Sequence, residues 1–96
     1  MPKEVWKGLH KLHEEMGELH QVLGKLAAYP TGQHPDGSNW RAKLIEELAD
    51  LEAVMVYFRN TNLTEQENQA ILRRVHSKHT KFQEWGLKGV QDNERK

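Results

Sequence analysis

Apolar residues recur at every third or fourth position over three long stretches of the chain. In the first stretch they are Val5, Leu9, Leu12, Met16, Leu19, Leu23 and Leu26. This spacing places a continuous apolar seam on one face of a helix. It predicts a helix from about Pro2 to about Ala28, since proline suits a first helical turn.

A second helix is predicted from Ser38 or Asn39, either of which can cap it, to about Arg59. Its main apolar stripe is widened by two further residues, and the full set is Leu44, Leu48, Leu51, Met55, Phe58, Ile45 and Val54. Residues 29–39 contain two prolines and two glycines. They predict a polar loop between the two helices, because that composition cannot hold a helix.

A third helix is predicted after a turn at residues 60–62. Thr64 and Glu67 match a capping box at its start, and Gly86 is a typical stop after Trp85. Its apolar set is thinner: Ile71, Leu72, Val75, Phe82 and Trp85. The pattern predicts an all-α fold, a short antiparallel bundle of three main helices over residues 1–86, followed by a polar tail at 87–96. We read no internal repeat.

Only 36% of the 96 residues are hydrophobic, whereas 29% are charged. A domain this short buries a small share of its surface and builds a thin core. It gains from burying a second apolar face against another copy of itself. We therefore expect homo-oligomerisation, as a homodimer or homotetramer, to complete the bundle.

Charge and residue usage exclude several classes of partner. The net charge is zero, which argues against binding to nucleic acid or to an anionic membrane surface. The absence of cysteine favours a reducing, cytoplasmic location. The sequence begins without an apolar signal core, and no apolar run is long enough to span a bilayer.

Two pairs of carboxylates border the apolar stripes of the first two helices. They are Glu15 with Glu18, and Glu47 with Asp50. A spacing of three puts both members on one helical face. If the helices pack antiparallel, the pairs meet at similar heights, where four carboxylates repel each other and lose hydration. Such oxygen ligands suit Mg²⁺, or Mn²⁺, better than zinc.

The ordinary alternative is a hydrated acidic face that pairs with lysine or arginine. Contact of both motifs with the apolar stripe, and the Gly/Pro-rich loop between them, favours a site instead.

The arrangement Glu14-Glu15-x-x-Glu18, followed after 28 residues by Glu47-x-x-Asp50, resembles the signature of the MazG-like all-α nucleoside triphosphate pyrophosphatases. The sequence segments at residues 15–19 and 43–51 are also similar to that family. The resemblance implies a Mg²⁺-dependent homo-oligomer that cleaves a (d)NTP between its α- and β-phosphates. It implies that the metal ligands are Glu15, Glu18, Glu47 and Asp50.

The resemblance further implies that Glu14 is another metal ligand or orients the attacking water, and that Glu14 and Glu18 are the catalytic carboxylates. It implies that basic residues of the third helix contact the phosphates, and we favour Lys78 and Lys81. The family often has an asparagine shortly before its lysine, whereas this chain reads Arg74-Val-His-Ser-Lys78. An exposed basic face remains an alternative for these residues.

Trp40, at the junction of loop and second helix, is a candidate to stack on a nucleobase, with core packing as the alternative. Histidines spaced by three, His10/His13 and His76/His79, would suit zinc only within a closed ligand set. A phosphoribosyl-ATP pyrophosphatase is the near alternative function. A non-enzymatic helical dimerisation or regulatory module is the alternative from another class.

Overall fold

The computed structural model describes residues 5–94, with side chains described as far as residue 86. It contains three helices: α1 (Leu9–Ala28), α2 (Trp40–Asn62) and α3 (Glu65–Glu94). Within the described residues the only strand-like pairing is an isolated bridge between Gln33 and Asn39. The predicted all-α class with three main helices is confirmed. The chain divides into two compact units, residues 1–63 and 64–96, and each is described by itself.

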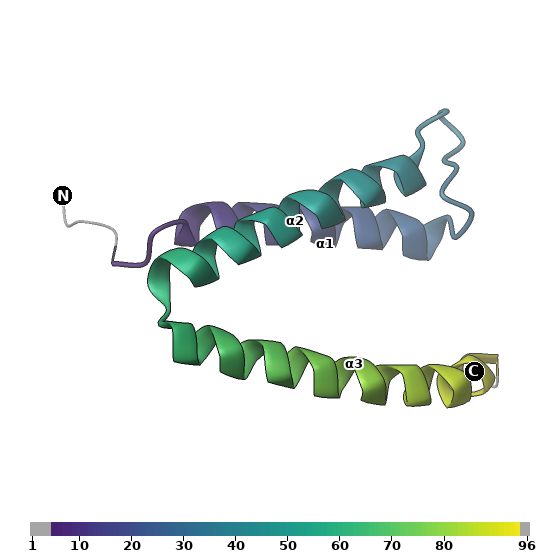
Figure 1. Ribbon diagram of the computed structural model, residues 1–96. Coiled ribbons are helices and arrows are strands. Elements are labelled where there is room, and N and C mark those ends of the chain that lie inside the picture. Colours follow the sequence, from purple (N-terminus) through teal and green to yellow (C-terminus); the bar gives the residue numbers. More distant parts are fainter. Residues whose placement is uncertain (1–4, 95–96) are drawn as a thin grey trace. The chain divides into compact units, whose positions relative to one another are not determined.

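Helices α1 and α2 form an antiparallel hairpin (Figure 1). Its interface buries one valine and one glutamate from each helix. Val22 is 2% exposed and Val54 is 9% exposed, while Glu15 is 5% and Glu47 is 3% exposed. In both helices the glutamate precedes the valine by seven residues, two helical turns, so the two side chains share a face. The core of the hairpin therefore contains as many carboxylates as aliphatic side chains.

Helix α1 begins later than predicted. Pro2 lies outside the described residues, and residues 5–8 form a bend and turn before the helix. Gly8 has a φ of +84°, a left-handed conformation that ends any helix extending from the N-terminal side. The turn is held on α2, because the Asn62 amide accepts from Lys7 N at 2.9 Å and donates to Lys7 O at 2.8 Å.

The same contact explains why α2 ends later than predicted. The expected turn at residues 60–62 is helical, and α2 continues to Asn62. The Asn62 side chain also donates to Phe58 O at 2.9 Å, so it satisfies a carbonyl of the last turn. At the other end, Asn39 caps α2 as expected by accepting from Ala42 N at 3.1 Å.

The predicted loop between the helices is confirmed, and it is held by its own hydrogen bonds. Trp40 N donates to Gly32 O at 2.7 Å, and His34 N donates to Ser38 O at 3.0 Å. The Asp36 carboxylate accepts from Ser38 N at 2.8 Å and from Ser38 Oγ at 2.6 Å. These two hydrogen bonds lower the pKa of Asp36. The loop thereby fixes the start of α2.

Helix α3 starts with the predicted capping box. Thr64 N donates to Glu67 Oε1 at 2.9 Å, and Glu67 N donates to Thr64 Oγ1 at 3.1 Å. The predicted stop at Gly86 is wrong, because α3 continues to Glu94. Gly86 does not have a positive φ, so it does not adopt the C-terminal cap conformation. The domain boundary after residue 86 stays a prediction.

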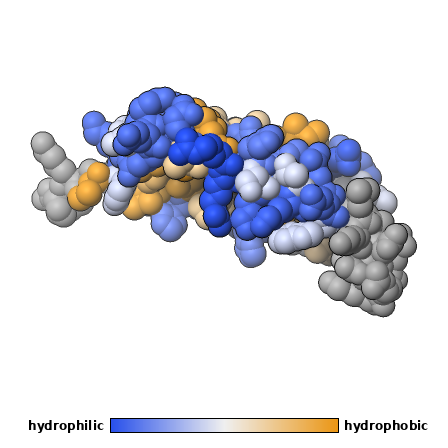
Figure 2. All heavy atoms as spheres, turned by 60° about the horizontal axis from the view of Figure 1, so that its bottom comes forward, coloured by the Kyte–Doolittle hydropathy of each residue, from blue (hydrophilic) through white to orange (hydrophobic). Residues whose placement is uncertain are grey.

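Many large apolar side chains remain exposed in both units, and Figure 2 shows hydrophobic residues (orange) among hydrophilic ones (blue) on one face. The seam predicted for α1 is split, since Met16 and Leu23 are exposed whereas Leu12, Leu19 and Leu26 are partly covered. On α2, Ile45 is 65% exposed. One hairpin alone does not cover its apolar surface.

Two glycine substitutions in this hairpin should have opposite effects on stability. Gly8→Ala forces a Cβ into a left-handed backbone and to within 3.0 Å of Tyr57 Cε2, which should cost about 1–2 kcal/mol. Gly17 lies inside α1, and apart from its chain neighbours and the backbone of its own helix no described atom lies within 4 Å of an added Cβ. Gly17→Ala should therefore gain about 1 kcal/mol. Denaturant unfolding measures both values, and a neutral Gly8→Ala would contradict the described turn.

Candidate metal centre

The centre is built around Glu15 of α1 and Glu47 of α2, the two buried carboxylates of the hairpin. Each glutamate points inward because it lies two helical turns before a buried valine, Val22 or Val54, on the same helical face. One oxygen of each carboxylate, Glu15 Oε2 and Glu47 Oε2, is buried without a hydrogen-bond partner among the described residues. A buried carboxylate oxygen without a partner is costly, and a protein normally satisfies it with a hydrogen bond or a cation.

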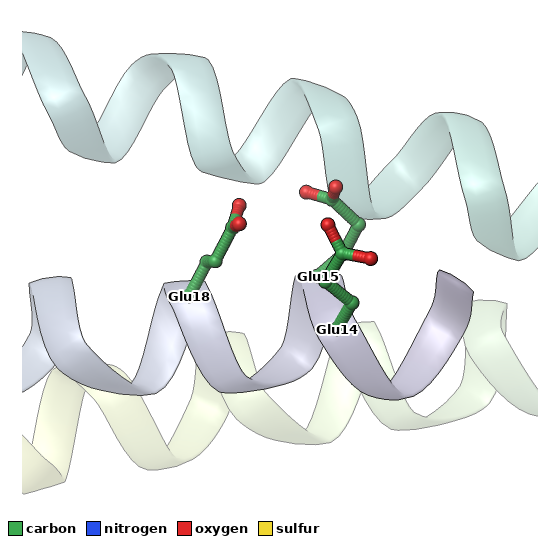
Figure 3. A group of neighbouring side chains, drawn as sticks. All are labelled: Glu14, Glu15 and Glu18. Carbon is green, nitrogen blue, oxygen red and sulfur yellow. The ribbon is translucent and has the colours of Figure 1, made fainter. Parts of the chain in front are cut away.

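The predicted acidic residues come together around these two glutamates. Ligand oxygens of Glu15, Glu47 and Asp50 lie within 4.8 Å of one another, and so do those of Glu14, Glu15 and Glu18. Figure 3 shows the second group, with all three side chains on α1. Glu15 belongs to both groups, so the described oxygens form one continuous acidic cluster across two helices.

Burial is the largest cause that raises the pKa of Glu47, and the nearby Glu18 carboxylate raises it further. Lys43 acts in the opposite direction, and Glu15 adds a smaller upward contribution. The ionised form of Glu47 is therefore disfavoured in the absence of a cation.

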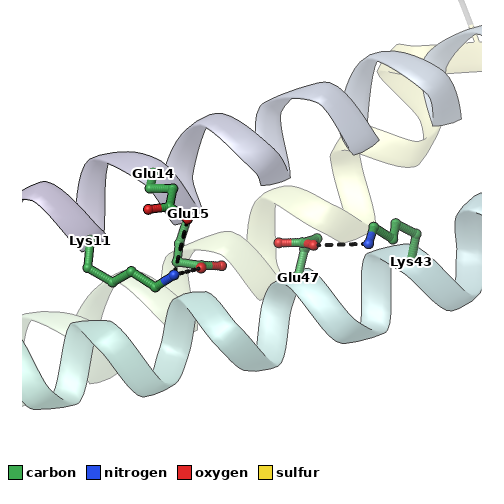
Figure 4. A network of polar contacts seen from close by, with 5 residues as sticks. All are labelled: Lys11, Glu14, Glu15, Lys43 and Glu47. Atoms are coloured by element: carbon green, nitrogen blue, oxygen red, sulfur yellow. Dashed lines mark hydrogen bonds and ion pairs between the residues drawn. The ribbon is translucent and has the colours of Figure 1, made fainter.

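Two lysines supply positive charge at the outer sides of the glutamate pair (Figure 4). Lys11 Nζ lies 3.1 Å from Glu15 Oε1 and 3.1 Å from Glu14 Oε1. Lys43 Nζ lies 3.6 Å from Glu47 Oε1 and 3.7 Å from Glu46 Oε2. Hydrogen bonds to Glu14 and Glu15 raise the pKa of Lys11, and the charge of Glu46 is the largest cause that raises the pKa of Lys43.

The donor set fits a hard divalent cation. All candidate ligands in both described groups are carboxylates, and neither group contains a histidine. Carboxylate oxygens suit Mg²⁺ and Mn²⁺, whereas structural zinc sites use cysteine and histidine. The two unpartnered oxygens of Glu15 and Glu47 are the atoms that a cation would satisfy.

The structure also draws attention to an internal repeat that the sequence analysis missed. Residues 11–22 read KLHEEMGELHQV and residues 43–54 read KLIEELADLEAV, an offset of 32 positions. Six positions are identical: Lys11/Lys43, Leu12/Leu44, Glu14/Glu46, Glu15/Glu47, Leu19/Leu51 and Val22/Val54. Glu18 corresponds to Asp50. The expectation of a chain without a repeat is therefore wrong, and the repeat is the signal that would have identified Lys11 and Lys43.

Trp40 lies at the start of α2, beside this centre. Its indole Nε1 is buried without a hydrogen-bond partner among the described residues, and Lys25 Nζ lies 5.7 Å from the ring centroid. The ring lines a hollow of about 420 Å³, together with Gln21, Gly24, Lys25, Ala28, Tyr29 and His34. Trp40 and Gln21 also line a smaller hollow that reaches Glu18 and Glu47.

The remaining predicted site residues are not members of the two acidic groups. Lys78 and Lys81 belong to α3, in the other compact unit, and their contact with phosphates stays a prediction. His10, His13, His76 and His79 are not part of either acidic group. The role of Glu14 and Glu18 in catalysis also stays a prediction, although each contributes a carboxylate oxygen to the cluster.

Comparisons of the chain with protein-family models, with curated proteins and with solved structures found no match. Among the described residues, no helix combines the length and the apolar character needed to cross a membrane.

Replacing Glu47 by glutamine should reveal its electrostatic cost in the metal-free protein. Because its folded pKa is raised above the usual 4.5, the stability that protonated Glu47 contributes is full below pH 4.5. It is lost as pH rises through the folded pKa. Glu47→Gln should therefore gain stability over wild type as pH rises from 4 to 7.5.

Thermal unfolding in chelator measures this difference between the two proteins. Millimolar Mn²⁺ at pH 7.5 should then raise the Tm of wild type but not that of Glu47→Gln. A Tm difference that does not change with pH would contradict the described burial of Glu47.

Proposed function

We propose that this chain is a divalent-cation-dependent nucleotide pyrophosphohydrolase. It would convert a (d)NTP and water into a nucleoside monophosphate and pyrophosphate. The observation that supports it most strongly is the pair of buried glutamates, each with an oxygen that lacks a partner, inside a cluster of acids from two helices. A hydrated acidic face, the ordinary alternative, would leave such carboxylates exposed.

The proposed roles of the chain's residues follow from their burial. Glu15, Glu47, Glu18 and Asp50 would hold Mg²⁺ or Mn²⁺, with the two buried glutamates as its fixed anchors. When bound, the cation supplies positive charge for the phosphates and for the leaving pyrophosphate. Trp40 would hold the base, because an aromatic ring can stack on any nucleobase.

The reaction replaces one bond to phosphorus by another. The water oxygen would bond to the α-phosphorus while the bond to the α,β-bridging oxygen breaks, and its electron pair leaves with pyrophosphate. Glu14 or Glu18 would accept the proton of the water. Both lie on the exposed side of the cluster, where water reaches them.

The alternatives account for fewer observations. A helical interaction module explains the exposed apolar faces, but it has no use for carboxylates in its core. A phosphoribosyl-ATP pyrophosphatase would use the same residues on another nucleotide, and it differs only in substrate. That compound belongs in the substrate panel.

The activity assay compares wild type, Glu47→Gln and the matched control Glu52→Gln, an exposed glutamate of the same helix. NTPs, dNTPs and phosphoribosyl-ATP are supplied with Mg²⁺ or Mn²⁺ in ¹⁸O-water. We expect pyrophosphate release that chelator abolishes, with the label in the monophosphate. Glu47→Gln should lose at least about 100-fold in activity, because mutations of residues that merely support metal ligands already cost about 10- to 100-fold. Glu52→Gln should retain activity.

Two results would contradict the proposal. One is the absence of pyrophosphate release from every substrate by folded wild type. The other is equal activity of Glu47→Gln and Glu52→Gln, which would place the reaction elsewhere.

The exposed apolar faces support a second part of the proposal, assembly as a homodimer or homotetramer. Ile45 and Leu23 are exposed on the two helices of the hairpin, and a second copy would remove such side chains from water. Sedimentation should give a multiple of 11.2 kDa. Ile45→Glu should shift the protein towards monomer by burying a charge in the interface. A wild-type monomer at high concentration would contradict this part of the proposal.

A further inference from the structure

The repeat gives the hairpin two grooves with equivalent linings. One groove, of about 480 Å³, is lined by Lys11, Glu15, Asp50, Ala53, Val54 and Tyr57. The other, of about 260 Å³, is lined by Lys43, Glu47, Glu18, Gln21, Val22 and Trp40. A shift of 32 residues relates the first five members of each list. The two helices therefore build two half-sites of the same design, each with a buried glutamate, an acid from the other helix and a lysine.

In each half-site the lysine lies at one oxygen of the buried glutamate, Oε1, and supplies positive charge that a cation would also supply. Lys11 Nζ contacts Glu15 Oε1 at 3.1 Å, and Lys43 Nζ lies 3.6 Å from Glu47 Oε1. Both lysine side chains are about half exposed, whereas both glutamates are buried. The glutamates are therefore fixed, while the flexible lysines can reach other acceptors nearby.

We infer that Lys11 and Lys43 neutralise the two buried glutamates in the metal-free protein and bind phosphate oxygens when divalent cations take over the carboxylates. The inference rests on the proposed function. A lysine ammonium has three donors and no acceptor. Lys11 keeps Glu14 and Lys43 keeps Glu46 as a neighbour when the buried glutamate binds a cation, and the donors that this frees can bind a further anion. The phosphates that accompany the cation into the acidic groove are such anions.

The differences between the half-sites give the nucleotide a direction. The groove of Lys43 contains Trp40 and Gln21 and leads to the hollow beside Tyr29 and His34. The groove of Lys11 has Ala53 in place of Gln21, and it lies towards the far end of the hairpin, since Asp50 is about 15 Å along α2 from Trp40. Lys43 is thereby assigned to the α-phosphate and Lys11 to the outer phosphates.

The test uses Lys11→Met, Lys43→Met and, as a matched control, Lys7→Met, an exposed lysine before α1. Mn²⁺ affinity is measured without nucleotide. Both site variants should bind Mn²⁺ about two- to five-fold more tightly, because a competing charge is gone. With Mn²⁺ saturating, both should bind inorganic tripolyphosphate about 10-fold more weakly. A structural ion pair predicts the first effect without the second.

Product affinities test the direction. Lys43→Met should weaken nucleoside monophosphate binding, and Lys11→Met should weaken pyrophosphate binding. The reverse pattern would overturn the assigned direction. If wild type hydrolyses nucleotides but both variants match Lys7→Met in tripolyphosphate affinity, the inference is wrong and the proposed function stands.

If wild type hydrolyses no nucleotide, the tripolyphosphate binding measurement still tests whether Lys11 and Lys43 bind phosphate. Weaker binding by both site variants would keep the phosphate assignment and overturn the hydrolase. No binding of tripolyphosphate to Mn²⁺-loaded wild type would overturn both.

Discussion

The burial of Glu15 and Glu47 against each other's helix is the constraint on which the rest of the hairpin depends. These two carboxylates take core positions that aliphatic side chains would otherwise fill, beside only two buried valines. The arrangement lowers the stability of the metal-free fold at neutral pH, because burial and the neighbouring acid Glu18 both disfavour the ionised form of Glu47. Lower local stability is common at functional sites, where the binding geometry is formed in advance. A divalent cation bound between these carboxylates would offset the repulsion.

The internal repeat explains how so small a chain builds this centre. Two copies of one amphipathic pattern face each other antiparallel, so that Glu15 lies beside Val54 in one groove and Glu47 beside Val22 in the other. Each helix thus supplies one anchor, one edge acid and one lysine. The two copies differ in that Trp40 and Gln21 line one groove whereas Ala53 and Tyr57 line the other, and the direction proposed for the nucleotide rests on this difference.

Periodicity predicted the three helices well, because long apolar stripes and polar loop residues leave little choice of local structure. The helix ends were harder. The turn at Gly8 and the extension of α2 to Asn62 depend on one contact between residues 55 positions apart, which local patterns do not contain. The predicted stop at Gly86 failed because nothing there imposes the left-handed backbone.

The spacing of Glu15/Glu18 and Glu47/Asp50 predicted their convergence, since both pairs border apolar stripes. Lys11 and Lys43 were missed because an exposed lysine four residues before a glutamate is common on helices. The internal repeat and the burial of the two glutamates together distinguish these lysines.

The central claim is that Glu15 and Glu47 bind divalent cations together. The direct measurement is a Mn²⁺ titration, followed by the electron paramagnetic resonance signal of free Mn²⁺, of wild type beside the double variant Glu15→Gln/Glu47→Gln and the control Glu52→Gln. Saturable binding by wild type and by the control, lost in the double variant while its helical content is retained, is the predicted result. Equal Mn²⁺ binding by all three proteins, or none by wild type, would contradict the account.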